Sequence, residues 1–167
     1  MSAAAAGAGA AVEATKHVLE RVAGAAERAG RRPDEVRLVA VTKGVDVGLM
    51  DAYLAAGIAR DLGENRAQEL DAKHSALAHR APRWHFIGTL QRNKAGLVVG
   101  RAVSIHSVDS ERLARAIGDK ATALGIAQRV LLEVNTSGEV SKHGVTPGEA
   151  ADVAHAVAAV SGVELGG

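Results

Sequence analysis

The chain is 167 residues long, with a net charge of +1 and 47% hydrophobic residues, values typical of one folded globular domain. Near-neutral charge and only three aromatic residues leave neither the basic surface nor the stacking platform of a nucleic-acid binder, so we expect no nucleic-acid partner. The lack of cysteine excludes disulfides and Cys-based zinc sites and is compatible with a reducing compartment, so we expect the cytoplasm.

Residues 1–11 are nearly all alanine and glycine. They contain neither the basic segment of a signal peptide nor enough apolar residues to span a membrane, so we expect a flexible arm. From Val12 to Ala29 apolar residues recur at helical spacing, until Gly30 and Pro33 end the pattern. No other stretch has the length of apolar residues that a membrane helix needs, so we expect no membrane partner. The folded domain is therefore predicted over residues 12–167.

The run Leu38-Val39-Ala40-Val41-Thr42-Lys43 has the apolar, β-branched character of a parallel strand that is buried on both faces. Further strands are predicted near 60–63, 84–88, 103–108, 129–134 and from 162 onward, with helices near 65–79, 93–99, 111–124 and 147–160. This alternation is typical of either an open doubly wound sheet or a β/α barrel, and periodicity does not choose between them. Because neither a G-x-G-x-x-G turn nor a phosphate-binding P-loop follows any strand, the barrel is favoured by elimination.

Lys43 is the residue on which the functional hypothesis mainly depends. A lysine at the end of a parallel strand lies at the carboxyl edge of the sheet, where α/β proteins bind their ligands. Partial desolvation there would favour the free amine, which can attack a carbonyl and form a Schiff base. The alternative is a solvated lysine that merely ends the strand.

Two further residues follow or occupy predicted strands. Asn65, directly after the second strand, could point at a ligand held by Lys43 or could simply cap the next helix. His85, in the third strand, is either an ordinary core histidine or a ring that stacks on a planar cofactor.

Other motifs have weaker interpretations. Gln91-Arg92-Asn93-Lys94 brings two cations to a helix start, which indicates either a nearby anion or only a solvated face. The polar loop over residues 135–144 is either a functional rim or a plain connection. The seven histidines show no metal-binding spacing and no nucleophile elbow is present, so we expect neither a metal site nor a serine nucleophile.

The motifs at Leu38 to Lys43, Gly63-Glu64-Asn65 with Gln68-Glu69, Trp84 to Gly88 with Leu90 to Lys94, and Asn135 to Gly144 together resemble the pyridoxal phosphate homeostasis protein family. These are the YggS-like relatives of the alanine racemase N-terminal barrel. The resemblance implies a TIM-like β/α barrel of the fold-type III class of pyridoxal 5′-phosphate (PLP) proteins. It also implies that Lys43 binds PLP as an internal aldimine, that Asn65 and His85 line the pocket, and that no residue is catalytic.

The resemblance also implies two missing strands with the turns that hold the phosphate. A β/α barrel takes about 250 residues, so we expect an incomplete barrel of five to six of eight strands, truncated within the sixth. An open barrel edge predicts self-association, and the loss of the phosphate-holding turns predicts weaker cofactor binding.

The function expected from the resemblance is intracellular PLP homeostasis, in which the protein binds, buffers and delivers PLP, with PLP-dependent apoenzymes as partners. One alternative is a racemase-like PLP enzyme, which needs a second acid or base that the sequence does not identify. The other is a vestigial or interaction fragment that completes its sheet with another chain.

Overall fold

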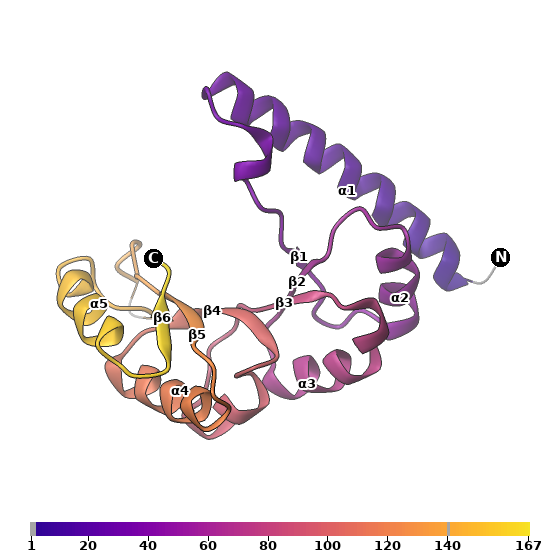
Figure 1. Ribbon diagram of the computed structural model, residues 1–167. Helices are drawn as coiled ribbons and strands as arrows, with labels where there is room; N and C mark the ends of the chain where they lie inside the picture. Colours follow the sequence, from indigo (N-terminus) through magenta and orange to yellow (C-terminus); the bar gives the residue numbers. More distant parts are fainter. Residues whose placement is uncertain (1–2, 140) are drawn as a thin grey trace. The chain divides into compact units, whose positions relative to one another are not determined.

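The computed structural model describes residues 3–139 and 141–167, so Met1, Ser2 and Val140 of the predicted arm and loop lie outside the described residues. The chain divides into two compact units, residues 3–63 with 75–83 and residues 64–74 with 84–167. Figure 1 shows the order of helices and strands along the chain. The division crosses a strand, a helix and a strand, and each unit is described in turn.

The first unit begins with a long helix, α1 (Ala3–Arg28), in contact with α2 (Val47–Ala55). The flexible arm predicted over residues 1–11 is therefore helical from Ala3 onward. Alanine has the highest helix propensity, and α1 gains tertiary support where Ala8 is 4% exposed and the Thr15 hydroxyl lies 3.0 Å from that of Tyr53 on α2. This packing could not be predicted from composition, because the alanine-rich segment has no strong stripe of large hydrophobic residues.

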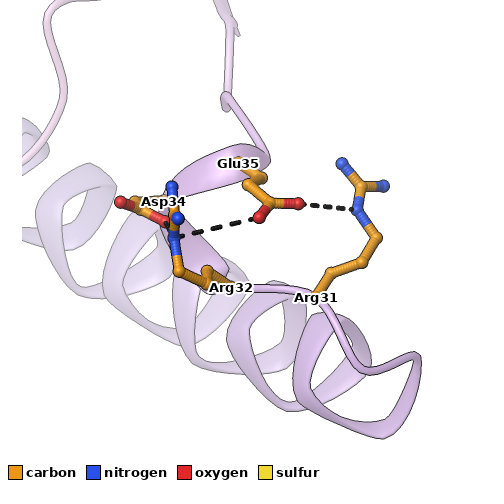
Figure 2. Close-up of polar contacts among 4 residues, drawn as sticks. All are labelled: Arg31, Arg32, Asp34 and Glu35. Carbon is orange, nitrogen blue, oxygen red and sulfur yellow. Dashed lines mark hydrogen bonds and ion pairs between the residues drawn. The ribbon is translucent and has the colours of Figure 1, made fainter.

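A short 3₁₀ turn, η1 (Pro33–Glu35), follows α1 and is surrounded by charged side chains. Arg31 pairs with Glu35 at 3.3 Å, and Arg32 pairs with Asp34 at 3.0 Å and with Glu35 at 3.8 Å (Figure 2). All four side chains are at least 39% exposed, so solvent screens these pairs and they add little to the stability of the turn.

The first strand, β1 (Ala40–Val41), is much shorter than the predicted run over 38–43. It pairs in parallel with β2 (Asp61–Glu64), in the register Ala40 to Leu62 and Val41 to Gly63. Val41 is 51% exposed, so the prediction of burial on both faces is wrong. The ladder is short because residues 36–38 line a hollow in this unit instead of pairing with β2.

Between β2 and the third strand lie α3 (Ala67–Ala76) and a 3₁₀ turn, η2 (Ala78–Arg80). Within the first unit, Arg80 of η2 donates two hydrogen bonds to Asp51 of α2, at 2.7 and 3.0 Å, and His79 lies 2.7 Å from the same carboxylate. These contacts lower the pKa of Asp51 to about 2, with the Arg80 hydrogen bond as the largest cause. The contacts of Arg80 and His79 with Asp51 hold η2 against α2.

The second unit contains a parallel run of strands in the order β3 (Arg83–Phe86), β4 (Ala102–Val108), β5 (Gln128–Leu132) and β6 (Val163–Leu165). The connections are a 3₁₀ helix, η3 (Arg92–Leu97), and two α-helices, α4 (Glu111–Ala123) and α5 (Ala150–Ala158). α4 contacts β5 and β6, and α5 contacts β6 (Figure 1). The apolar sides of these helices and strands form the core of the unit, with Ile105, Ile117 and Val130 fully buried.

Most of the predicted elements of this unit agree with the structure within a few residues. Ser110, one of two predicted caps, accepts a hydrogen bond from the Leu113 N–H at 3.3 Å and begins α4. The helix predicted near 93–99 is instead the 3₁₀ helix η3, and the helix predicted from Pro147 begins at Ala150. In the part of the chain that the structure describes, no helix is both long enough and apolar enough to cross a membrane.

Candidate functional site

Lys43 lies in the first unit, in the turn that joins β1 to α2. The Thr42 N–H donates to the Gly63 carbonyl at 2.9 Å, and the Val45 N–H donates back to the Thr42 carbonyl at 3.0 Å. Gly44 has φ of 70°, the left-handed conformation that a type II turn requires at its third position. The backbone of Lys43 is therefore held just past the carboxyl end of β1.

The element after this turn is also fixed. Asp46 accepts hydrogen bonds from the N–H groups of Gly48 at 2.8 Å and Leu49 at 3.2 Å, which caps the start of α2. A tight turn followed directly by a capped helix restricts the backbone on both sides of Lys43. The predicted strand includes Lys43, but the structure places this residue two positions beyond the end of β1.

The Lys43 side chain is exposed, so the partial desolvation predicted for it is wrong for this structure. The strand around it is short and open, which leaves the side chain in contact with solvent. Within the described residues Lys43 forms no ion pair, in contrast to Lys16, which pairs with Glu13 at 2.7 Å, and to the buried Lys73. An accessible primary amine without a carboxylate partner is able to react with an aldehyde.

Asn65 lies in the second unit, in the bend that follows β2. Because α3 begins at Ala67, Arg66 and not Asn65 precedes its first residue, and the capping interpretation is wrong. Within the described residues the half-buried Asn65 amide forms no hydrogen bond and is available to a ligand. Its backbone is tightly packed, because a Cβ placed on Gly88 would lie 2.1 Å from the Asn65 carbonyl oxygen. Only glycine fits at position 88.

A buried ion-pair network begins at Glu64, the residue that precedes Asn65. Lys73, whose side chain is 6% exposed, donates to the fully buried Glu64 at 2.7 Å and to Glu69 at 2.8 Å. The Glu64 carbonyl accepts a hydrogen bond from the Ile87 N–H at 2.9 Å, which joins the ends of β2 and β3. Breaking such a pair from one side leaves a buried charge, so we infer that the network holds the backbone around Asn65 in place. This network was not predicted from the sequence, although the spacing of Glu69 and Lys73 by four residues is typical of an ion pair on a helix.

His85 lies in β3, also in the second unit, and is 4% exposed. Its Nδ1 is 2.9 Å from Nε2 of His106 on β4, and the two rings meet edge to face at 80°. Burial, and secondarily His85, lowers the pKa of His106, which favours its neutral form. His106 was not singled out from the sequence, although period-two alternation along β4 could have placed it next to His85.

The structure thus leaves Asn65 and His85 in one unit and Lys43 in the other. The described residues contain no group of three or more His, Asp or Glu side chains that could hold a metal ion. The first unit offers an exposed amine, and the second offers an amide with free hydrogen-bonding capacity and a pair of imidazoles of which His85 is buried.

Parallel strands that alternate with helices define six strands of a β/α barrel of the TIM type, a fold that has eight in its full form. Residues 13–167 match the family described as alanine racemase, N-terminal domain. The TIM-like barrel predicted from the sequence is therefore confirmed.

Individual proteins that are similar to this chain identify the subgroup of the family more closely. A pyridoxal phosphate homeostasis protein of Aquifex aeolicus is 42% identical over 137 residues, which cover 82% of this chain and 60% of that protein. A crystal structure of a protein from Bifidobacterium adolescentis has a TM-score of 0.88 and 41% identity, and covers all of this chain and 70% of its own. The structure of PipY from Synechococcus elongatus, solved with PLP bound, has a TM-score of 0.70 and 32% identity over 86% of this chain and 67% of that one.

The chain belongs to the pyridoxal phosphate homeostasis proteins within the alanine racemase N-terminal domain family. The resemblance read from the sequence motifs is thereby confirmed. The chain spans 60% of the length of the Aquifex relative.

Proposed function

We propose that this chain binds PLP through Lys43 and serves PLP homeostasis without turning over a substrate. The observation that carries the proposal is the geometry of Lys43: an exposed amine, unpaired among the described residues, on a type II turn at the end of β1. PLP supplies an aldehyde, which condenses with a primary amine to form a C=N bond and release water. The membership in the family and the PLP-bound relative PipY support this choice of ligand.

The residues of the chain fit such a group in chemical terms. Lys43 would hold it covalently. The Asn65 amide can donate or accept a hydrogen bond, and His85 presents a flat ring that its contact with His106 keeps in one orientation. Asn65 and His85 remain predictions for PLP contacts, and we assign them no catalytic role.

The first test is a titration of the purified chain with PLP, followed by borohydride reduction and peptide mapping. We expect the modified peptide to contain Lys43 and the Lys43→Met variant to lose it. Lys120→Met is the matched control, because Lys120 is an exposed lysine in the last turn of α4. Equal labelling of many lysines, or a Lys43→Met variant that is labelled like the parent, contradicts the proposal.

Asn65→Ala and His85→Phe then test the other two residues. Each is expected to weaken PLP binding while reduction still modifies Lys43. His85→Phe keeps a flat ring, so a loss of affinity would assign the effect to the imidazole nitrogens. If both variants bind PLP as tightly as the parent, these residues are structural only.

Absence of turnover is part of the proposal. The purified, PLP-loaded chain is expected not to racemise alanine above the rate of free PLP. A rate that depends on Lys43 would favour the racemase-like alternative instead.

We further propose that the physiological role is in the cytoplasm and that loaded protein passes PLP to PLP-dependent apoenzymes. Recovery of apoenzyme activity after mixing with the loaded chain, compared with the same concentration of free PLP, measures this transfer. Self-association, proposed from the open barrel edge, is measured by sedimentation over a range of concentrations. A monomer at all concentrations removes that part of the proposal.

A further inference from the structure

A small hollow in the second unit has an unusual set of lining residues. Its volume is about 210 Å³, and it lies where the chain leaves β2 and β3. We call it the Arg66 hollow. Its charged and polar lining consists of Arg66, Lys94, Asn65, Gln68, Gln91 and Thr89, and the remaining lining residues are apolar. No carboxylate is among the residues that line it.

The two cations have no charge partner in the part of the chain that the structure describes. Arg66 is exposed and Lys94 is half-buried, and neither forms an ion pair there. The nearby acids are engaged elsewhere, since Glu64 and Glu69 both bind Lys73. Two cations that share one hollow repel each other until an anion occupies it.

The backbone adds to this positive potential. Arg66 precedes the first turn of α3, a helix of ten residues, and the N-terminal end of a helix carries unpaired N–H groups and a partial positive charge. The amides of Gln68 and Gln91 and the Thr89 hydroxyl can donate further hydrogen bonds to an oxyanion. The hollow therefore combines two full charges with several neutral donors.

The walls of the hollow are fixed before any ligand enters. The Ile87 N–H bonds to the Glu64 carbonyl at 2.9 Å, and Gly88 approaches the Asn65 backbone too closely to admit any side chain. On the far side, the Lys94 N–H closes a turn onto the Gln91 carbonyl at 2.9 Å. A site that is already ordered loses little conformational entropy when it binds.

We propose that the Arg66 hollow binds a small tetrahedral dianion, namely free phosphate or the phosphate group of a small phosphate monoester. Two cations match the two charges of a dianion, and the volume is below the range of about 300–1,000 Å³ usual for drug-sized ligands. The inference goes beyond the proposed PLP function, because it does not use Lys43.

The test is a titration of the full chain with inorganic phosphate at low ionic strength, followed by calorimetry or by amide chemical shifts. The Lys43→Met variant is titrated in parallel and is expected to bind phosphate like the parent. This titration distinguishes the two proposals. If the Lys43→Met variant loses PLP labelling but still binds phosphate, the phosphate-site proposal stands independently of the PLP proposal. Methyl phosphate in a second arm distinguishes a monoester site, which binds it at least as tightly as free phosphate, from a site for phosphate alone.

Lys94→Gln and Arg66→Gln are each expected to weaken phosphate binding about tenfold or more, the loss expected for one charge-assisted contact. Gln68→Glu, which places a carboxylate in the lining, is expected to abolish binding. Arg92→Gln is the matched control: Arg92 is an exposed cation of η3 that does not line the hollow, and its loss is expected to change affinity by less than about twofold.

All variants change side chains that are exposed or half-buried, and circular dichroism confirms that each is folded. The proposal is overturned if Arg92→Gln weakens binding as much as Lys94→Gln, because the attraction is then diffuse. It is equally overturned if the parent chain shows no saturable binding at millimolar phosphate.

Discussion

Two of the hollows in the described part of the chain contain cationic side chains and differ in whether acids accompany them. The first unit has a hollow of about 590 Å³ before the starts of its strands, here called the Asp61 hollow, lined by Arg37, Arg60 and Arg83 together with Asp34 and Asp61. The Arg66 hollow of the second unit has two cations and no carboxylate in its lining.

In the Asp61 hollow a buried acid pairs with two of the three arginines. Arg83 donates two hydrogen bonds to Asp61, one of them at 3.0 Å, and Arg37 lies 3.9 Å from the same carboxylate. The contact with Asp61 raises the pKa of Arg83. The same pairing recurs where Arg80 meets Asp51 in this unit. Cations that already have acids nearby stabilise the fold, whereas cations without them attract a ligand from solution.

The largest expected effect comes from Lys73→Met, which removes the buried cation that pairs with Glu64. Glu64, fully buried, would lose its charged partner. We expect the free energy of unfolding to fall by about 3–5 kcal/mol, as when one member of a buried pair is lost. Urea denaturation measures the loss. Glu69→Gln is the control, with a smaller loss expected because Glu69 is 24% exposed; equal losses would show that burial of Glu64 does not matter.

A second change would make the Asp61 hollow resemble the Arg66 hollow. Asp61→Asn removes the buried carboxylate but keeps its shape, so we expect a loss of about 1–3 kcal/mol in unfolding free energy. It also leaves Arg37 and Arg83 without this acid. In a background of Arg66→Gln and Lys94→Gln, the Asp61→Asn variant is expected to gain phosphate binding by calorimetry. A variant that gains none would show that missing acids alone do not make an anion site.

The pH dependence of stability at Asp51 tests how much a paired acid contributes to the fold. Its pKa is about 2 in the folded chain and 3.8 ordinarily, so its stabilising contribution is present above pH 3.8 and is lost as pH falls through about 2. The Tm of Asp51→Asn is expected to lie below that of the parent at pH 7, and the difference to shrink between pH 3.8 and 2. Asp119→Asn, an exposed carboxylate on α4, serves as the control and is expected to show no such trend. A constant difference for Asp51→Asn at all pH values contradicts the assignment.

The smallest effect is expected at the turn drawn in Figure 2. The Arg32 side chain is 76% exposed although it contacts two acids. Arg32→Ala is therefore expected to change the free energy of unfolding by less than about 0.5 kcal/mol, since exposed pairs add little. Denaturation at low and high salt checks this. A loss above about 1 kcal/mol that salt removes would show that exposed pairs also matter in this chain.

The sequence by itself determined the β/α alternation, the family and the position of Lys43 near the carboxyl end of the first strand. These features depend on local patterns: β-branched runs for strands, helical spacing of apolar residues, and caps such as Ser110. The strands β3 to β6 were predicted within a few residues because each combines a recognisable run with a turn residue at its ends.

Tertiary structure alone decided the remaining features, because they arise from contacts between residues distant in the chain. The helix α1 extends back to Ala3 because Ala8 packs against other parts of its unit, while β1 is cut to two residues because its neighbours line a hollow. The pairing of His85 with His106 depends on the register of β3 and β4. Glu64 and Glu69, which are close to Arg66 in sequence, bind Lys73 and do not line the Arg66 hollow. A residue's chemical type is written in the sequence, but its partners, and so its role, are set by the fold.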